Sequence, residues 1–288
     1  MRPPKTFRHG GLSLDLERDW RPASPVQNSF LPNAAAILLK QHAGPAARCL
    51  VRKGEYVREG ALLGKAEGAG SAAIHASVPG VVRDIRRVRL PEGGECEAAV
   101  IVLEGSFDRL GKRMEKYLWK GVSRGDLLQT LRDRGVVETE PPGRPLYELL
   151  REREKTELLV LNAIESEPYL RTEAAVLADR GPEVLEGFAI LRKILAPERW
   201  ILALDASETE ALARAAESAK GLEEAPESIL LEPRYPQDLP SLLLEVIQRD
   251  RHAAKGKPSA VIVRPSTALA VYEAVALARP FLERYVTV

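Results

Sequence analysis

The chain has 288 residues, which is enough for two domains of ordinary size. Hydrophobic residues make up 45% and charged residues 29%, a globular composition that excludes a largely disordered chain. The formal net charge of +1 and the 5% aromatic content argue against a nucleic-acid partner. No stretch approaches the roughly 18 apolar residues of a membrane span, and the N-terminus lacks the apolar core of a signal peptide. We therefore expect a soluble, cytoplasmic protein.

The two cysteines, Cys49 and Cys96, are too few and too far apart for an iron–sulfur cluster, which needs four thiolates. The four histidines are scattered and offer no close pair for a zinc site. We therefore expect no iron–sulfur cluster and no metal in this chain. We interpret both cysteines as small, at least half-buried thiols, and His42 and His75 as structural residues.

From about residue 30 to residue 104, short apolar runs alternate with glycine and proline, a pattern that predicts strands. The expected strands are 36–39, 47–51, 61–65, 80–85 and 98–103. No helical period appears in this stretch, whereas the texture changes from about residue 123. We therefore expect two domains, 1–110 and 111–288, with a hinge region at 105–121.

The second half begins with Ser123, a candidate N-cap for a helix that carries Leu127, Leu128 and Leu131 on one face. Strands and helices then alternate, which predicts an α/β sheet with helices on its faces. The expected strands are 157–162, 200–205, 228–232, 260–264 and 283–288. The expected helices are 173–179, 183–195, one opened by a capping box of Ser207 and Glu210 and running to 220, 239–249, and one capped by Ser266 or Thr267 and running to 278.

Residues 50–64 read LVRKGEYVREGALLG, which resembles the first half of the barrel-sandwich fold of lipoyl and biotinyl carrier domains. Residues 75–82, HASVPGVV, resemble the second half of that fold. A carrier presents a modified lysine on the hairpin between the two halves, but residues 67–71 read EGAGS. We therefore predict a β-rich barrel-sandwich hybrid domain without a lipoyl or biotinyl group, followed by the α/β domain.

Motifs along the whole chain resemble one family, RnfC, the peripheral NADH-side subunit of the Rnf ion-translocating electron transport complex. They occur in the family's order, and they are 7–11 (FRHGG), 41–46 (QHAGPA), 162–169 (NAIESEPY), 234–237 (RYPQ), 267–272 (TALAVY) and 283–288 (ERYVTV). The segment 162–169 is also similar to a motif in the flavin subunit of respiratory complex I. The resemblance implies FMN on the α/β domain, which takes hydride from NADH and passes electrons to iron–sulfur clusters in a later segment.

Three departures from the family pattern bear on that implication. The family's glycine-rich flavin loop corresponds here to 135–146, GVVETEPPGRPL, where two carboxylates and two prolines replace most glycines. Proline removes amide donors, and Glu138 and Glu140 would repel a phosphate. The other two departures are 263–267, VRPST, and 238–240, DLP. The chain also stops at Val288, before the family's cluster cysteines, so we interpret it as a truncated member with a degenerate FMN and NADH site.

The candidate cofactor-binding residues are Asn162, Glu165, Glu167, Tyr235 and Thr267. Asn162 follows a buried strand, where α/β sheets place ligand-contacting groups. The resemblance implies that Asn162 hydrogen-bonds the flavin and that Glu165 and Glu167 line the nicotinamide side. The alternative is a loop kept for its own turn, in which Pro168 and Tyr169 fix the chain.

For Tyr235 and Thr267, too, a ligand-binding role and a purely structural role are both open. Tyr235, on the loop after the third strand of the α/β half, contacts a ligand or simply packs that loop. The amides of Ser266 and Thr267, with Arg264 just before them, form either an anion site or a helix cap beside a surface arginine.

Two functions follow from these observations. The first is an auxiliary, non-catalytic subunit of a membrane-associated electron-transfer assembly, held peripherally on the inner face of the membrane by partner subunits. The alternative is an FMN-binding NADH oxidoreductase subunit that passes electrons to a separate ferredoxin-like protein. No nucleic-acid partner is expected in either case.

Overall fold

The computed structural model describes residues 3–13, 26–107, 115–153, 155–249 and 258–288. Contacts divide the chain into two compact units, each assembled from separate stretches of sequence. The α/β unit comprises 1–27, 154–269 and 285–288, and the barrel-sandwich unit comprises 28–153 and 270–284. These units differ from a single division at residue 110. Part of the expected hinge, residues 108–114, lies outside the described residues.

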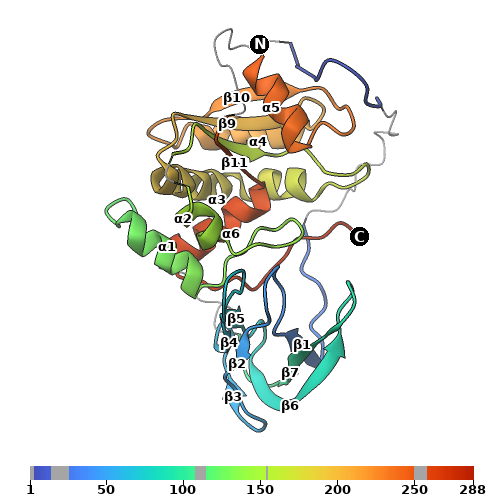
Figure 1. Ribbon diagram of the computed structural model, residues 1–288, viewed down its shortest axis with the longest axis vertical. Helices are drawn as coiled ribbons and strands as arrows, with labels where there is room; N and C mark the ends of the chain where they lie inside the picture. Colours follow the sequence, from blue (N-terminus) through green and yellow to red (C-terminus); the bar gives the residue numbers. More distant parts are fainter. Residues whose placement is uncertain (1–2, 14–25, 108–114, 154, 250–257) are drawn as a thin grey trace. The chain divides into compact units, whose positions relative to one another are not determined.

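The barrel-sandwich unit contains two antiparallel sheets (Figure 1). One sheet has the order β1-β7-β6-β3 and the other has the order β2-β4-β5. The strands are β1 (Ala34–Leu38), β2 (Arg48–Cys49), β3 (Tyr56–Val57), β4 (Leu62–Lys65), β5 (Ile74–His75), β6 (Gly80–Arg89) and β7 (Glu95–Leu103). All five strands expected here overlap a strand of the structure. The pattern misses β3 and β5, each only two residues long.

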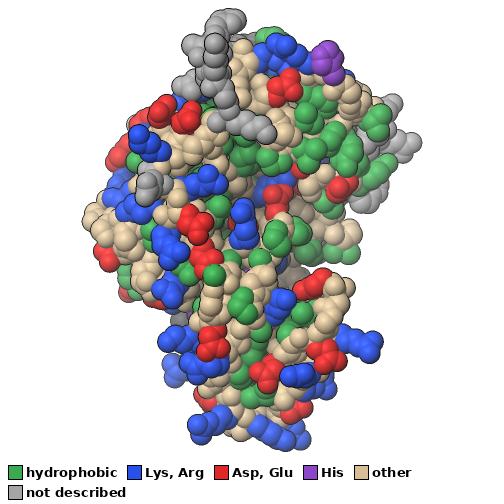
Figure 2. Space-filling view, in the orientation of Figure 1, with side chains coloured by type: hydrophobic (Ala, Val, Ile, Leu, Met, Phe, Trp, Pro, Cys, Tyr) green, Lys and Arg blue, Asp and Glu red, His purple; other side chains and the backbone are tan. Residues whose placement is uncertain are grey.

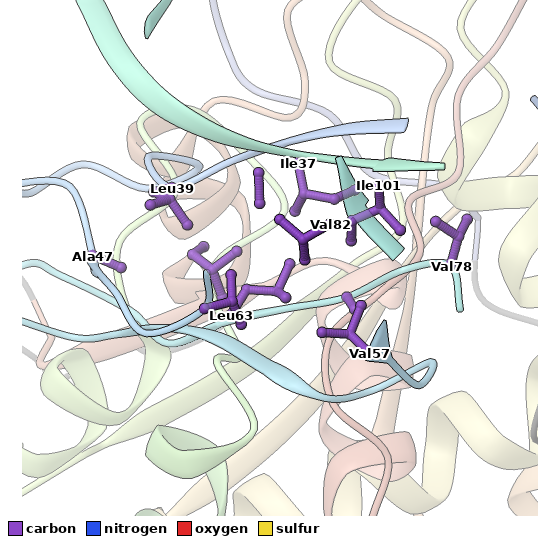
Figure 3. Close-up of a cluster of buried hydrophobic side chains, with 12 residues drawn as sticks. Ile37, Leu39, Ala47, Val57, Leu63, Val78, Val82 and Ile101 are labelled. Carbon is purple, nitrogen blue, oxygen red and sulfur yellow. The ribbon is translucent and has the colours of Figure 1, made fainter. Parts of the chain in front are cut away.

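Aliphatic side chains from the two sheets form the core of this unit (Figure 3). Val82 and Ile101 occupy the same register position on β6 and β7, and Leu63 of β4 belongs to the same cluster. All three side chains are fully buried. Burying such a side chain contributes about 1.5–3 kcal/mol, so the alternating apolar positions of the barrel-sandwich motif are explained by packing.

Two helices, α1 (Arg124–Asp133) and α2 (Leu146–Arg151), also belong to the barrel-sandwich unit. Ser123 accepts a hydrogen bond from the Asp126 amide, so the predicted N-cap of α1 is confirmed. The carboxylate of Glu148 in α2 accepts the Gly70 amide at 3.0 and 2.9 Å. This bond ties α2 to the loop between β4 and β5. Contacts of this kind place residues 115–153 in the barrel-sandwich unit and not in the α/β unit.

The α/β unit contains a parallel sheet of order β10-β9-β8-β11 (Figure 1). Its strands are β8 (Leu158–Asn162), β9 (Arg199–Asp205), β10 (Glu227–Leu231) and β11 (Ala260–Val263). All five residues of β8 are buried, as the continuous apolar run predicts for an inner parallel strand. The N-terminal arm joins this unit, since Lys5 pairs with Leu231 and Phe7 lies in its core. Residues 3–13 therefore do not belong with the strands that follow them.

Helices cover both faces of this sheet (Figure 1). They are α3 (Thr172–Leu195), α4 (Thr209–Ala219) and α5 (Pro240–Gln248). α6 (Pro265–Ala276) begins in this unit, but its residues from Ala270 on belong to the barrel-sandwich unit. Leu243 of α5 clusters with Val160 and Ile201 on one face. On the other face, Phe188 of α3 packs against Trp200 of β9 with ring centroids 5.2 Å apart. The alternation of side chains along β8 and β9 assigns each helix to its face.

The break expected between helices at 173–179 and 183–195 is confirmed, because α3 is interrupted by a kink at Arg180, whose backbone is not helical, just before Gly181 and Pro182. Three other details of the α/β prediction need correction. Ser207 does not cap α4, because its amide and hydroxyl both donate to Asp205. α6 begins at Pro265, so Ser266 and Thr267 lie in its first turn. Residues 283–288 do not form a strand.

On the face shown in Figure 2, basic and acidic side chains are interspersed. The arginines on β6 are exposed; they are Arg83, Arg86, Arg87 and Arg89. This distribution agrees with the near-zero net charge of the chain.

Candidate functional site

Asn162 is the last residue of β8 and is almost completely buried. Its side-chain amide donates to the carbonyl oxygen of Asp238 at 3.1 Å, and its side-chain oxygen accepts the Ile164 amide at 3.2 Å. Asn162 therefore joins the loop after β8 to the loop after β10. In the structure, Asn162 thus holds two loops together at the carboxyl edge of the sheet.

Glu165 lies in the same loop and faces the N-terminus of α3. One of its carboxylate oxygens accepts the amides of Glu173 and Ala174 at 2.8 and 3.0 Å. Burial raises the pKa of Glu165 from 4.5 to about 7, although the two amides partly oppose that shift. Glu165 therefore acts as the capping group of α3, which lacks a capping side chain of its own at Arg171.

Glu173, in the first turn of α3, plays the same part for α6. It accepts the Ser266 amide at 2.8 Å and the Ser266 hydroxyl at 2.6 Å. Thr267 follows in the same turn of α6 and is buried. Two helix N-termini of this unit therefore already receive carboxylates from the chain itself, where anions bind in other proteins.

A buried ion pair connects two further loops at this edge. The Arg264 guanidinium donates to the Asp238 carboxylate at 3.1 Å and to the carbonyl oxygen of Ile164. The two charged side chains are only 6% and 8% exposed. Arg264 is therefore not the surface arginine of one expectation, nor is it directed at an external phosphate. The ion pair therefore links two of the segments that differ from the family pattern, 263–267 and 238–240.

Tyr235 and Glu167 form the outer part of the site. The Tyr235 hydroxyl lies 3.4 Å from a carboxylate oxygen of Glu167, and the charge of Glu167 raises the pKa of Tyr235. Close by in sequence, Gln237 is buried and accepts a hydrogen bond from Thr6. The side-chain nitrogen of Gln237 is buried and has no hydrogen-bond partner within the described residues.

Hydrogen bonds thus connect four of the five predicted site residues to the loops of one sheet edge, and Thr267 lies in the helix that Glu173 caps. The sequence pattern missed Glu173 and Asp238 as members of this network. Glu173 reads as an ordinary first-turn glutamate, so nothing local marks its bond to Ser266. The simultaneous departures at Asp238 and Arg264 were the available signal for their pairing.

The loop that replaces the family's glycine-rich segment lies in the barrel-sandwich unit and closes on itself. Its amides at Glu138 and Gly143 donate to carbonyl oxygens of Arg144 and Glu140, within the same loop. The Leu146 amide donates to Val136. Arg144 forms an ion pair with Glu138 at 2.8 Å, so neither charge is directed outward alone.

Comparison with known proteins adds two matches that follow one another along the chain. Residues 5–106 match the model of the RnfC barrel sandwich hybrid domain, and residues 131–275 match the model of the Nuo51 FMN-binding domain. The chain belongs to the RnfC-like family. This membership confirms the predicted fold class, a barrel-sandwich hybrid domain followed by an α/β domain of the flavin-subunit type.

Curated RnfC-like relatives match nearly the whole chain. The relative from Clostridium ljungdahlii, a component of a proton-translocating ferredoxin:NAD(+) oxidoreductase complex, is 27% identical over 99% of this chain and 63% of its own length. The relative from Pseudomonas aeruginosa, a component of an ion-translocating oxidoreductase complex, is 30% identical over 96% of this chain and 36% of its own length. The RnfC-like chain thus spans between about a third and two thirds of these relatives.

A solved structure of an NAD+-reducing [NiFe]-hydrogenase is similar over 54% of the RnfC-like chain and 31% of its own chain, with a TM-score of 0.46 and 20% identity. Among the residues that the structure describes, no helix is both long enough and apolar enough to cross a membrane. In the same ranges, no three His, Cys, Asp or Glu side chains group to hold a metal ion.

Proposed function

We propose that this RnfC-like chain is an auxiliary subunit of an ion-translocating electron-transfer complex, held at the membrane by partner subunits. The names of the curated relatives, which are components of such complexes, support the assembly. In this role the chain binds other subunits on the side of the complex where NADH reacts, and it carries no redox centre itself. Electrons pass through redox centres on its partners, a ferredoxin-like protein among them.

The closed loop at 135–146 is the observation that carries the auxiliary role. A flavin phosphate needs several backbone amides or cations directed at it. In this loop the amides of Glu138 and Gly143 are used internally, and Pro141 and Pro142 have none. Glu138 and Glu140 add two negative charges, of which Arg144 offsets the one on Glu138. The residues present therefore do not fit the phosphate of FMN.

The α/β unit supports the same proposal independently. The N-terminus of α3 receives Glu165, and the N-terminus of α6 receives Glu173. A phosphate approaching either helix would have to displace a carboxylate. Two unit charges of the same sign at 4 Å repel by about 4 kcal/mol at an intermediate effective dielectric, so these helix ends disfavour a dianionic ligand.

Flavin retention tests the auxiliary role. The full chain is incubated with FMN, desalted and examined by visible absorbance and by calorimetric titration. We expect colourless protein and no saturable heat at FMN concentrations up to about 100 µM. A matched variant carrying Glu138→Gln and Glu140→Gln reports whether loop charge alone excludes the flavin. Stoichiometric yellow wild-type protein would contradict the proposal.

Association with the complex needs a separate measurement. An affinity-tagged chain is expressed in its native host, and membranes are fractionated before and after a high-salt wash. We expect the chain in the membrane fraction together with other subunits of the complex, and released when those subunits are deleted. If the chain stayed entirely in the supernatant as a monomer, the proposal that it belongs to a membrane-bound complex would be wrong.

The second candidate is an FMN-binding NADH oxidoreductase subunit that uses Asn162, Glu165, Glu167, Tyr235 and Thr267. Two observations favour it: the clustering of these residues at the carboxyl edge of the sheet, and the side-chain nitrogen of Gln237, which is buried without a partner among the residues that the structure describes. Asn162→Ala is then expected to abolish flavin binding and NADH oxidation. An Asn162→Ala protein with both properties unchanged would exclude this candidate.

A further inference from the structure

The barrel-sandwich unit contains a cavity of about 250 Å³ that the proposed function does not use. It lies between the end of β1, the β5 region, the 135–137 turn and the segment after α6. Its apolar lining residues include Ile37, Leu38, Ile74, Val137, Phe281 and Leu282. Four side chains that carry a nitrogen also line it, namely Gln41, His42, His75 and Arg284.

His42 has a ring nitrogen, Nδ1, that can accept a hydrogen bond. Its Nε2 atom lies 2.8 Å from the carbonyl oxygen of Pro45, which can only accept, so Nε2 carries the proton. Its Nδ1 atom is buried and has no partner within the described residues. The side chain is 5% exposed, and burial lowers its pKa, so the ring is neutral and Nδ1 keeps a free lone pair.

His75, at the end of β5, has the same arrangement. A hydrogen bond to the backbone of Asp133 uses one ring nitrogen, while Nδ1 is buried without a partner in the described ranges. Burial lowers the pKa of His75 to about 4, so this ring is also neutral near pH 7. A Cβ atom placed on Gly135 would contact His75 Nδ1 at 3.5 Å. The glycine therefore leaves the space beside that lone pair open.

Arg284 supplies positive charge at the exposed side of the cavity. Its guanidinium donates to the carbonyl oxygen of Thr139 at 3.2 Å and stacks over the Phe281 ring at 5.1 Å. It has no carboxylate partner among the described residues. Partial burial lowers the pKa of Arg284.

From this combination we propose that the cavity binds a small, mostly apolar organic acid that also carries an O–H or N–H donor. The acid group pairs with Arg284, the donor hydrogen-bonds the Nδ1 atom of His42, and the apolar body fills the remaining walls. Arg284 disfavours a metal cation, and an inorganic anion would leave the His42 lone pair and the apolar walls without partners. The cavity lies just below the roughly 300–1,000 Å³ of sites for drug-sized ligands, so a single-ring molecule is the appropriate size. The site does not depend on the proposed function.

The probe is 4-hydroxybenzoate, which combines a carboxylate, an apolar ring and a hydroxyl donor. The full chain is titrated by calorimetry and by NMR, alongside benzoate, which lacks the donor, and 4-hydroxybenzamide, which lacks the charge. We expect saturable 1:1 binding of 4-hydroxybenzoate and at least about fivefold weaker binding of each comparator. The histidine ring signals of His42 and His75 are expected to shift on binding.

Variants distinguish this cavity from adventitious sites. Arg284→Gln and His42→Ala are each expected to weaken binding at least about tenfold. Arg86→Gln, an exposed arginine of the same unit, and His9→Ala, an exposed histidine, serve as matched controls and should bind as the wild type does. Circular dichroism verifies that every variant is folded. No saturable binding by folded wild-type protein below about 10 mM, or binding that neither Arg284→Gln nor His42→Ala weakens, would overturn the proposal and leave the cavity to bound water.

Discussion

Glu173, in the first turn of α3, accepts both the amide and the hydroxyl of Ser266, in the first turn of α6, at 2.8 and 2.6 Å. Glu165 accepts in turn the amides of Glu173 and Ala174. Each carboxylate thus satisfies donors that a helix leaves unpaired at its N-terminus. Together, the two carboxylates link the loop after β8 to the N-terminus of α3, and α3 to the start of α6 after β11.

The Glu173 bond should be measurable as stability of the α/β unit. Glu173→Ala removes two hydrogen bonds and a favourable charge at a helix N-terminus, so we expect a loss of about 1–3 kcal/mol. Urea unfolding followed by tryptophan fluorescence measures it. Glu210→Ala, an exposed first-turn glutamate of α4, is the control and should change stability by less than about 0.5 kcal/mol. Equal effects of the two substitutions would contradict the capping role.

Glu165 should give this unit a pH dependence of defined sign. Its pKa in the folded chain is raised from 4.5 to about 7, so the folded state binds the proton more tightly. The associated stability is fully present below pH 4.5 and is lost as the pH rises through about 7, by at most about 3 kcal/mol. Glu165→Gln keeps the acceptor oxygen and removes the charge. We expect it to raise the melting temperature at pH 8 more than at pH 5.

Melting curves of wild type, Glu165→Gln and the exposed control Glu210→Gln between pH 5 and pH 8 test this sign. The difference between wild type and Glu165→Gln should grow steadily over that interval. The control should remain parallel to the wild type. A Glu165→Gln protein that is destabilised most at pH 8 would show that the carboxylate is needed in its charged form.

Arg264 and Asp238 should be strongly coupled, because both are almost completely buried. Arg264→Met leaves the Asp238 charge buried without its partner, and Asp238→Asn does the converse. We expect each single substitution to cost about 3–5 kcal/mol and the double variant to cost less than the sum. A double-mutant cycle from urea unfolding measures the coupling. Strict additivity would mean that the pair contributes no specific interaction.

Gly135 should tolerate no side chain, for a reason that separates it from other glycines of the barrel-sandwich unit. Its φ is +67°, and an added Cβ would lie 2.2 Å from the carbonyl oxygen of Ala73. Gly93 also has a positive φ, +95°, but an added Cβ there meets nothing within 4 Å. Both alanine substitutions share the backbone strain of about 1–2 kcal/mol. We expect Gly135→Ala to cost clearly more.

Thermal unfolding of Gly135→Ala and Gly93→Ala side by side isolates the steric effect. The melting temperature of Gly135→Ala should fall well below that of Gly93→Ala. Indistinguishable melting temperatures would show that the 135–146 loop can move away from Ala73, and that its closed form is easily opened.

Most of the secondary structure could be predicted from local sequence. The buried run at Leu158–Asn162 marks an inner parallel strand, and Ser123 marks the start of α1, because burial on both faces and helix capping act within a few residues. The failures are also local in origin. Ser207 has a capping-box partner at the right spacing, yet its hydroxyl bonds to Asp205, two residues earlier. Competing side-chain bonds of this kind cannot be ranked from spacing alone.

The partners of the site residues were decided by tertiary structure. The motif at 162–169 places Asn162 and Glu165 after a strand, and the family resemblance suggests a flavin for them. Only the parallel sheet brings Asp238 beside Asn162 and Arg264, because it gathers the carboxyl ends of β8, β10 and β11 at one edge. Likewise, one cavity is lined by His42, His75 and Arg284, although Arg284 lies 242 positions after His42 in the sequence. Hydrogen bonds and ion pairs are short-range, so their partners depend on the packing of distant segments, while strand and helix patterns depend on neighbours in the chain.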